Sequence, residues 1–178
     1  MLYLLALLAV LAILGLLGLH RAVRGSTGDR SDLDWLPARL LDAELLWSEK
    51  EFRCLEPIAI SMRLDRAYRS PDGRLTLIEF KHRPLARSYP SDVVELSVQR
   101  YVLQKAGYAV DQRAYVVVIP AGGGIERALP VVLEDAREVE RRAARLQAIK
   151  AGKVVPAGSA HPAVCRECGH RDACPLRR

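Results

Sequence analysis

One stretch near the middle of the chain, residues 63–83, constrains the fold most strongly, because it has the pattern of two strands joined by a tight turn. Its sequence is RLDRAYRSPDGRLTLIEFKHR. Strand-forming residues lie on both sides of 70–73, and Ser-Pro-Asp-Gly at 70–73 is typical of a turn. The stretch therefore predicts a β-hairpin, with a first strand over 57–69 and a second over 74–81.

Two carboxylates and a lysine gather on this predicted hairpin. In a strand, residues two apart share a face, so Glu79 and Lys81 point the same way, and Asp65 lies across the turn from them. Converging carboxylates repel each other unless a cation lies between them, and hard oxygen ligands suit Mg²⁺ or Mn²⁺. Such a metal lowers the pKa of a bound water, and a neighbouring lysine stabilises developing charge. The pattern indicates phosphodiester hydrolysis; an exposed, salt-bridged hairpin is the structural alternative.

This fragment resembles the PD-(D/E)XK phosphodiesterase superfamily, whose motif is an Asp on one strand and Glu-x-Lys on the next. The resemblance implies an α/β fold with a restriction-endonuclease-like core, in which helices flank a mixed central β-sheet. It also implies that Asp65 and Glu79 are metal ligands and that Lys81 is the catalytic lysine. The RecB-like branch carries a glutamine on the helix after Glu-x-Lys. Gln99 matches that glutamine, whereas Leu103 stands where the branch has a tyrosine.

The chain begins with an apolar run, residues 2–19, that contains no charged residue. At about 1.5 Å per residue this run is long enough to cross the hydrocarbon core of a bilayer. No positive region precedes it and no small-residue cleavage site follows it, which favours a transmembrane anchor (1–20) over a cleaved signal peptide. Arginines follow directly, so the positive-inside rule predicts a single-pass membrane protein facing the cytoplasm. Residues 21–33 are then a linker, and 34–178 form one domain.

A helix is predicted over 34–53 from the spacing of its apolar residues, with Asp34 as its cap. In the resembled superfamily a leading helix often contributes one more acidic metal ligand. Glu44 is the candidate on this helix, and Glu51 is the second choice. A solvated surface glutamate is the alternative for either residue.

Further helices and strands are expected after the hairpin. Ser91 is predicted to cap a helix over 92–105 that Gly107 ends, and the apolar run 113–120 predicts a central strand. A turn and a strand over 126–131 precede a charged helix over 133–150. Arginines at positions 137, 141 and 145 lie on one face of that helix. They indicate either a stripe that follows a phosphate backbone or a solvated face with internal pairs such as Glu138 with Arg142.

Four cysteines indicate one metal site rather than two disulfides, because Cys165, Cys168 and Cys174 cluster in the tail while Cys54 stands alone. Either His170 completes a Cys₃His zinc site, or Cys54 completes a four-cysteine site able to hold an iron–sulfur cluster. The tail is similar to that of the iron–sulfur RecB-like nucleases, which include CRISPR-associated exonucleases. This resemblance implies a four-iron four-sulfur cluster held by all four cysteines.

The net charge of +6 favours an anionic partner, either nucleic acid or an acidic lipid surface. The expected function is a membrane-anchored, Mg²⁺- or Mn²⁺-dependent nuclease that acts on DNA, on single strands or ends. Two other functions are compatible with the sequence. One is a nucleic-acid-binding protein that keeps the fold and a structural zinc or iron–sulfur site but not the reaction. The other is a protein whose basic face meets anionic lipid.

Overall fold

The structure, a computed structural model, describes residues 35–120, 122, 127–157, 162–169 and 171–174. The predicted anchor (2–19) and linker (21–33) lie outside these residues, and so does His170. Within the described ranges, no helix combines the length and the apolar character needed to span a bilayer. The anchor therefore stays a prediction from the sequence.

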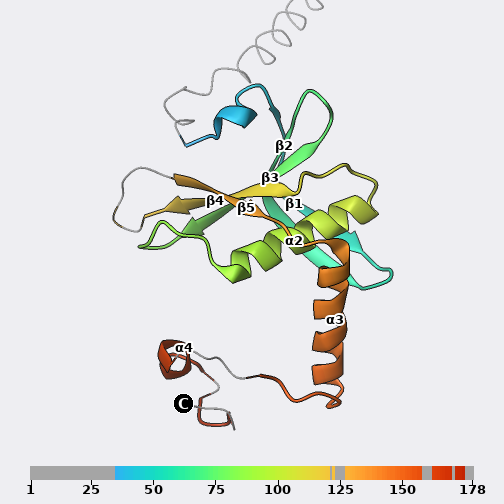
Figure 1. Cartoon of the computed structure of the whole chain (residues 1–178), viewed down its shortest axis with the longest axis vertical. Helices are drawn as coiled ribbons and strands as arrows, with labels where there is room; N and C mark the ends of the chain where they lie inside the picture. The colour runs from blue at the N-terminus through green and yellow to red at the C-terminus, as the bar shows by residue number, and fades with distance from the viewer. Residues whose placement is uncertain (1–34, 121, 123–126, 158–161, 170, 175–178) are drawn as a thin grey trace, which may run out of the picture.

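One mixed sheet of five strands, in the order β1-β2-β3-β4-β5, forms the centre of the protein (Figure 1). The strands are β1 (Glu44–Cys54), β2 (Ile60–Arg69), β3 (Leu75–His82), β4 (Arg113–Ile119) and β5 (Arg127–Val132). All neighbouring pairs are antiparallel except β3 and β4, which are parallel. A parallel pair needs a crossover, which helix α2 (Pro90–Lys105) supplies. The expected α/β fold, with a mixed sheet and flanking helices, is confirmed.

The predicted hairpin is present as β2 and β3. Its turn closes with a hydrogen bond from the Gly73 N–H to the Ser70 carbonyl (2.8 Å). Gly73 has a φ of +82°, a left-handed conformation that glycine adopts without steric cost. The first strand begins at Ile60 and not at residue 57, where a proline offers no N–H to a ladder.

The helix predicted over 34–53 is wrong. The segment contains a short 3-10 helix, η2 (Ala38–Leu40), and then strand β1. Strand β1 pairs with β2, and a bulge between Leu45 and Trp47 shifts the register. Glu49 adds a left-handed φ of 53°. These two irregularities break the two-residue alternation that marks a strand in sequence, so the remaining apolar spacing resembled that of a helix.

Helix α2 covers one face of the sheet. Its side chains Leu96 and Leu103 lie in one buried cluster with Leu77 of β3 and Val116 of β4. Strand β4 is central and buried along most of its length, as its apolar run predicted. Because α2 crosses β1, β2 and β3, polar residues on its inner side face the same strands as these leucines.

The ends of α2 are fixed by local hydrogen bonds. The helix begins after Tyr89, and Ser91 is not its cap as predicted, because Pro90 takes the first helical position, where no N–H is needed. The Asp92 carboxylate accepts the Tyr89 N–H at 2.8 Å. The predicted end is confirmed, since Gly107 follows the helix with a φ of +89°.

The N-terminal segment around η2 covers the opposite face of the sheet. Leu40 is fully buried there in a cluster with Ile78 and Val117. Asp111 fastens this layer, because its carboxylate accepts bonds from Arg74 Nε (2.7 Å) and Thr76 Oγ1 (2.8 Å) and pairs with Arg39 of η2. Both faces of the central strands are therefore covered.

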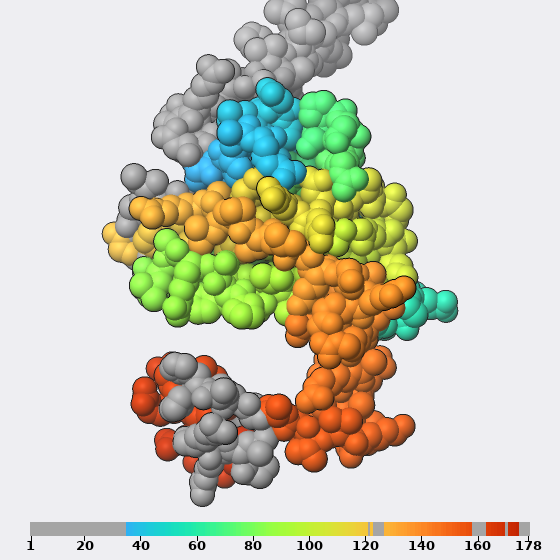
Figure 2. Space-filling view, viewed as in Figure 1, coloured from blue at the N-terminus to red at the C-terminus, as the bar shows by residue number. Residues whose placement is uncertain are grey.

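Helix α3 (Ala136–Lys150) leads away from the sheet, and α4 (Pro162–Arg166) lies to one side of its far half (Figures 1 and 2). Val139 is the one described residue of α3 that is buried, and it packs against α2 through Tyr101 and Val102. The predicted helix and the pair between Glu138 and Arg142 (3.1 Å) are confirmed. The arginine stripe at positions 137, 141 and 145 is exposed, as a solvated face would be.

Candidate active site

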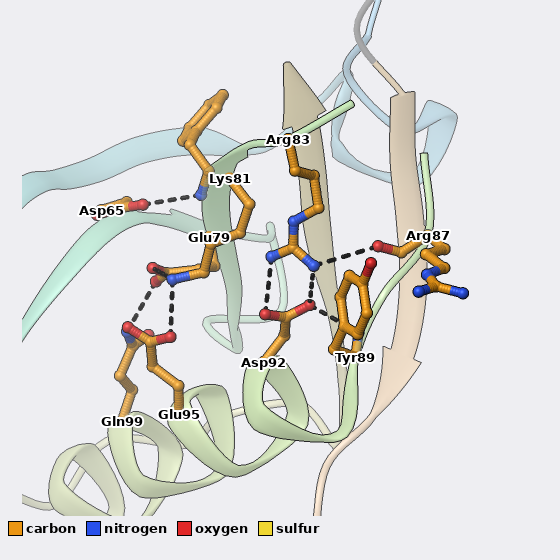
Figure 3. Close-up of polar contacts among 10 residues, drawn as sticks. Asp65, Glu79, Lys81, Arg83, Arg87, Tyr89, Asp92, Glu95 and Gln99 are labelled. Atoms are coloured by element: carbon orange, nitrogen blue, oxygen red, sulfur yellow. Dashed lines mark hydrogen bonds and ion pairs between the residues drawn. The ribbon is translucent and has the colours of Figure 1, made fainter. Parts of the chain in front are cut away.

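Strand β2 separates from β3 at Asp65. The backbone pairing of the two strands runs from Arg69 opposite Leu75 to Arg66 opposite Ile78, whereas β2 stays paired with β1 as far as Ile60. Beyond this point, the Asp65 carboxylate accepts the Phe80 N–H at 2.8 Å (Figure 3). A side-chain oxygen thus replaces the backbone partner that a continuous ladder would have supplied. This fork places a carboxylate beside the centre of β3.

Glu79 and Lys81 project from β3 toward α2, as their two-residue spacing predicts. Glu79 is 4% exposed, and its two oxygens have different partners. Oε1 accepts a bond from Lys81 Nζ at 2.7 Å, and Oε2 accepts one from Gln99 Nε2 at 2.9 Å (Figure 3). The predicted residues Asp65, Glu79, Lys81 and Gln99 therefore come together at one place on the sheet.

Helix α2 supplies two side chains to this site. Gln99 is 2% exposed, and its Oε1 is buried without a hydrogen-bond partner in the described part of the chain. Glu95, one helical turn earlier, accepts a bond from Lys81 Nζ at 2.7 Å. Sequence reasoning missed Glu95, although its position four residues before Gln99 on a predicted helix was a usable signal.

Burial dominates the electrostatics of the site. It raises the pKa of Glu79 to about 7, even though the bonds from Lys81 and Gln99 favour the charged carboxylate. The negative charges of Asp65 and Glu95 raise the pKa of Glu79 further. Burial also opposes the charge of Lys81, but Glu79 and Glu95 outweigh it and raise the pKa of the ammonium. The site therefore has an excess of negative charge around one lysine.

The side-chain oxygens at this site are of the kind that bind a hard divalent cation. Asp65 Oδ1 and Gln99 Oε1 accept no hydrogen bond from the described residues; Gln99 contacts Glu79, and the charge of Asp65 acts on it. The Lys81 ammonium is the cation that Glu79 and Glu95 share in the structure. Across the described ranges, no group of three or more His, Cys, Asp or Glu side chains is arranged to hold a metal. Because Lys81 Nζ contacts Glu79 Oε1, a cation at that oxygen would compete with the ammonium.

An ion pair between a partly buried arginine and a buried aspartate holds the start of α2 against the sheet. Arg83, two residues after Lys81, donates to both oxygens of Asp92 at 3.0 and 2.9 Å. The two side chains are 15% and 4% exposed. The pair fixes α2 relative to β3, so it sets the position from which Glu95 and Gln99 reach the site (Figure 3). Arg83 and Asp92 are nine residues apart with a loop between them, and this spacing matches no motif by which the pair could be predicted from the sequence.

The structure corrects the prediction for Glu44. This residue lies at the start of β1 opposite Arg69, which in turn lies opposite Leu75. Leu75 precedes Glu79 by four positions on β3, or about 13 Å at the rise of a strand. Glu44 pairs with Arg69 at 2.6 Å, and both side chains are exposed, at 64% and 45%. It is a surface glutamate and takes no part in the site; Glu51 is also an exposed strand residue, opposite Arg63.

Replacing Glu44 by alanine is expected to leave metal binding unchanged. The change in the free energy of unfolding should stay below about 1 kcal/mol, because exposed ion pairs contribute little. Urea unfolding and Mn²⁺ titration calorimetry on the wild type and the variant measure both quantities. A loss of Mn²⁺ affinity in this variant would contradict the assignment.

The cysteines are divided between two parts of the molecule. Cys54 ends β1, is buried against Tyr101 and Val139, and donates to the Glu56 carbonyl at 3.0 Å. The other three, Cys165, Cys168 and Cys174, lie in α4 and the successive turns after it. Among the described residues these four cysteines do not form a group arranged to hold a metal, so the structure does not bring Cys54 to the tail cysteines. The predicted four-cysteine site is thus not assembled in the structure.

Comparisons with known proteins bear only on the fold. No protein-family profile and no curated protein matches the chain. Among solved structures, the chain is similar to the crystal structure of SSO0001, with 16% sequence identity, coverage of 96% of this chain and 71% of that chain, and a TM-score of 0.51. At this identity the similarity supports the α/β architecture and nothing more.

Proposed function

We propose that this chain is a metal-dependent nuclease with a restriction-endonuclease-like core, which hydrolyses phosphodiester bonds in DNA. The observation that carries the proposal is the buried carboxylate of Glu79, which is hydrogen-bonded to Lys81 and Gln99 and lies beside Asp65 across the fork of β2 and β3. A buried carboxylate with a pKa near 7 among other acidic groups is costly for a purely structural role. Such groups are concentrated at reactive sites.

Asp65 and Glu79 would hold a Mg²⁺ or Mn²⁺ ion, which when bound supplies an acidified water and a positive charge for phosphate oxygens. Gln99 orients the Glu79 carboxylate through its amide N–H, and its free oxygen is a further acceptor at the site. Lys81 is partly exposed, at 24%, so its ammonium is able to reach a phosphate at the rim and stabilise charge there. The chain thus separates metal binding from charge stabilisation.

The net charge of the chain and its apolar N-terminal run are the basis for the proposed substrate and cellular location. A net charge of +6 favours an anionic partner, which for a phosphodiesterase would be nucleic acid, and the substrates would be single strands or ends. The apolar residues 2–19 would anchor the enzyme to a membrane, with the domain in the cytoplasm.

Cleavage of labelled single-stranded DNA, double-stranded DNA and RNA by the full chain tests this function. The wild type should cleave DNA with Mn²⁺ and lose the activity with EDTA. Glu79→Gln should lower the rate by about 10²-fold or more, because it removes a ligand charge without changing the side-chain volume. Glu51→Gln, an exposed glutamate on β1, is the matched control. Binding of DNA without any Mn²⁺-dependent cleavage would contradict a nuclease.

A second function, nucleic-acid binding without catalysis, is favoured by one observation. Lys81 already forms ion pairs with Glu79 and Glu95, and the described residues contain no assembled metal-ligand group. A protein of this kind would keep the fold and a structural zinc or iron–sulfur site. Its signature in the same assay is salt-dependent DNA binding that neither Mn²⁺ nor Glu79→Gln changes.

The four cysteines are proposed to hold a metal centre, which would require the tail to approach Cys54 at the end of β1. Chain purified without oxygen should be brown and contain about four irons, because three clustered thiolates plus Cys54 match a four-iron cluster. Cys168→Ala should remove the iron. The variant Cys54→Ala tests the fourth ligand, since in the structure Cys54 is buried at the end of β1. Stoichiometric zinc that survives Cys54→Ala would contradict the cluster and favour His170 as the fourth ligand.

A further inference from the structure

Lys81 is the central cation of the site, and two elements hold it. Its Nζ lies 2.7 Å from Glu79 Oε1 on β3 and 2.7 Å from Glu95 Oε2 on α2. The two carboxylates differ in burial: the side chain of Glu79 is 6% exposed and that of Glu95 is 46% exposed. The ammonium is thus shared between a deep carboxylate and one at the rim (Figure 3).

Lys81 cannot keep its contact with Glu79 when Glu79 binds a divalent cation. An ammonium and a divalent ion on the same buried carboxylate repel each other, and burial strengthens that repulsion. Glu95 is the second carboxylate in contact with Nζ and would then be the remaining anion that holds Lys81. Without Glu95, Lys81 would have Glu79 as its one carboxylate partner among the described residues and would compete with the metal for it.

We infer that Glu95 is a positioning residue, which draws the Lys81 ammonium away from Glu79 and holds it at the rim of the site, facing the substrate phosphate. The inference rests on the proposed nuclease function and adds a residue to it. Glu95 acts through Lys81 and is not itself a metal ligand. Gln99 lies four residues further along the same face of α2. Its amide holds Glu79 in a similar way, because Nε2 donates a hydrogen bond to Glu79 Oε2.

Metal affinity measured in two backgrounds tests this role. With the full chain, Glu95→Gln should weaken Mn²⁺ binding in calorimetry by about 10-fold, a size common for groups that orient metal ligands. In the Lys81→Ala background, the same substitution should change Mn²⁺ affinity by less than about 2-fold, because a rim charge on the solvent side is screened. Equal weakening in both backgrounds would make Glu95 a ligand and overturn the inference.

Kinetics give a second readout that a structural role would not produce. At saturating Mn²⁺, Glu95→Gln should lower kcat by about 10-fold with KM nearly unchanged, as expected when a charge is misplaced only in the transition state. Glu95→Asp keeps the charge and should restore part of kcat, while Glu51→Gln should leave kcat unchanged. Full activity in Glu95→Gln would overturn the inference.

The contact itself is measurable without any metal. The proton signal of the Lys81 ammonium in NMR reports its contacts, and Glu95→Gln should shift and weaken that signal because one of its two carboxylate partners is lost. An unchanged Lys81 signal in Glu95→Gln would overturn the inference. If the wild type neither binds Mn²⁺ nor cleaves DNA, the nuclease proposal fails, and the Lys81 signal still decides whether Glu95 holds the ammonium.

Discussion

Replacing Lys81 by alanine is expected to lower Mn²⁺-dependent DNA cleavage by at least about 10²-fold, because the substitution removes the one ammonium that the site holds. Mn²⁺ binding should be retained, since Asp65 and Glu79 remain and the cation that competes for Glu79 is gone. The cleavage assay and calorimetry on the same preparations measure the two effects. Retention of full activity would overturn the assignment of Lys81.

The fold should survive this substitution. Lys81 favours the charged form of Glu79, so in the metal-free protein its removal raises the pKa of Glu79 further and leaves the carboxyl protonated near neutral pH. A protonated carboxyl still bonds to Gln99, so the interior does not keep an isolated charge. Lys150→Ala, at the exposed end of α3, removes the same charge elsewhere and serves as the control. A loss of cleavage in this control would point to DNA binding and not to catalysis.

Replacing Arg83 by alanine is expected to destabilise the protein by about 3 kcal/mol, the lower end of the range for breaking a buried ion pair. Asp92 would remain buried with the Tyr89 N–H but without the guanidinium that contacts both of its oxygens. Urea unfolding at pH 7 measures the change. Arg87→Ala is the matched control, because this exposed arginine contacts the Tyr89 ring and forms no ion pair within the described residues.

The pH dependence of this effect has a definite sign. Burial acts to raise the pKa of Asp92, but Arg83 and the Tyr89 N–H outweigh it, so the pKa lies below its ordinary value. A lowered pKa in the folded state stabilises the protein above the unfolded pKa of about 4, and this stabilisation is lost as the pH falls through the folded pKa. The difference between the wild type and Arg83→Ala should therefore be largest at pH 7 and shrink below pH 4. An equal difference at both pH values would contradict the pairing.

Local sequence patterns predicted the elements that depend on neighbouring residues. The turn at 70–73 and the two-residue spacing of Glu79 and Lys81 are set by backbone geometry over a few positions, and both are confirmed. Strand β4 was predicted from its apolar run, and helix α2 from its expected start near Ser91 and its end before Gly107. Gln99 was found through a family motif, and the structure places it on Glu79.

Strand β1 shows where prediction from local sequence patterns failed. Residues 34–53 carry leucines and glutamates that favour a helix, yet β1 is a strand because it pairs with β2 along the sheet. The bulge after Leu45 and the left-handed Glu49 hid its alternation. Glu44 was placed on the wrong element for this reason, and it lies at the other end of the hairpin from Glu79.

By itself, the sequence determined the hairpin, the pair of Glu79 and Lys81 on one face, and the helix that carries Gln99. The tertiary structure alone decided that Asp65 fills the fork between β2 and β3, that Glu95 shares Lys81, and that Arg83 and Asp92 pin the start of α2. The physical reason is the separation of the interacting residues along the sequence. Turns and strand faces follow from a few consecutive dihedral angles. A contact between charges on different elements depends instead on the strand order and on how the helix crosses the sheet, which many distant residues determine together.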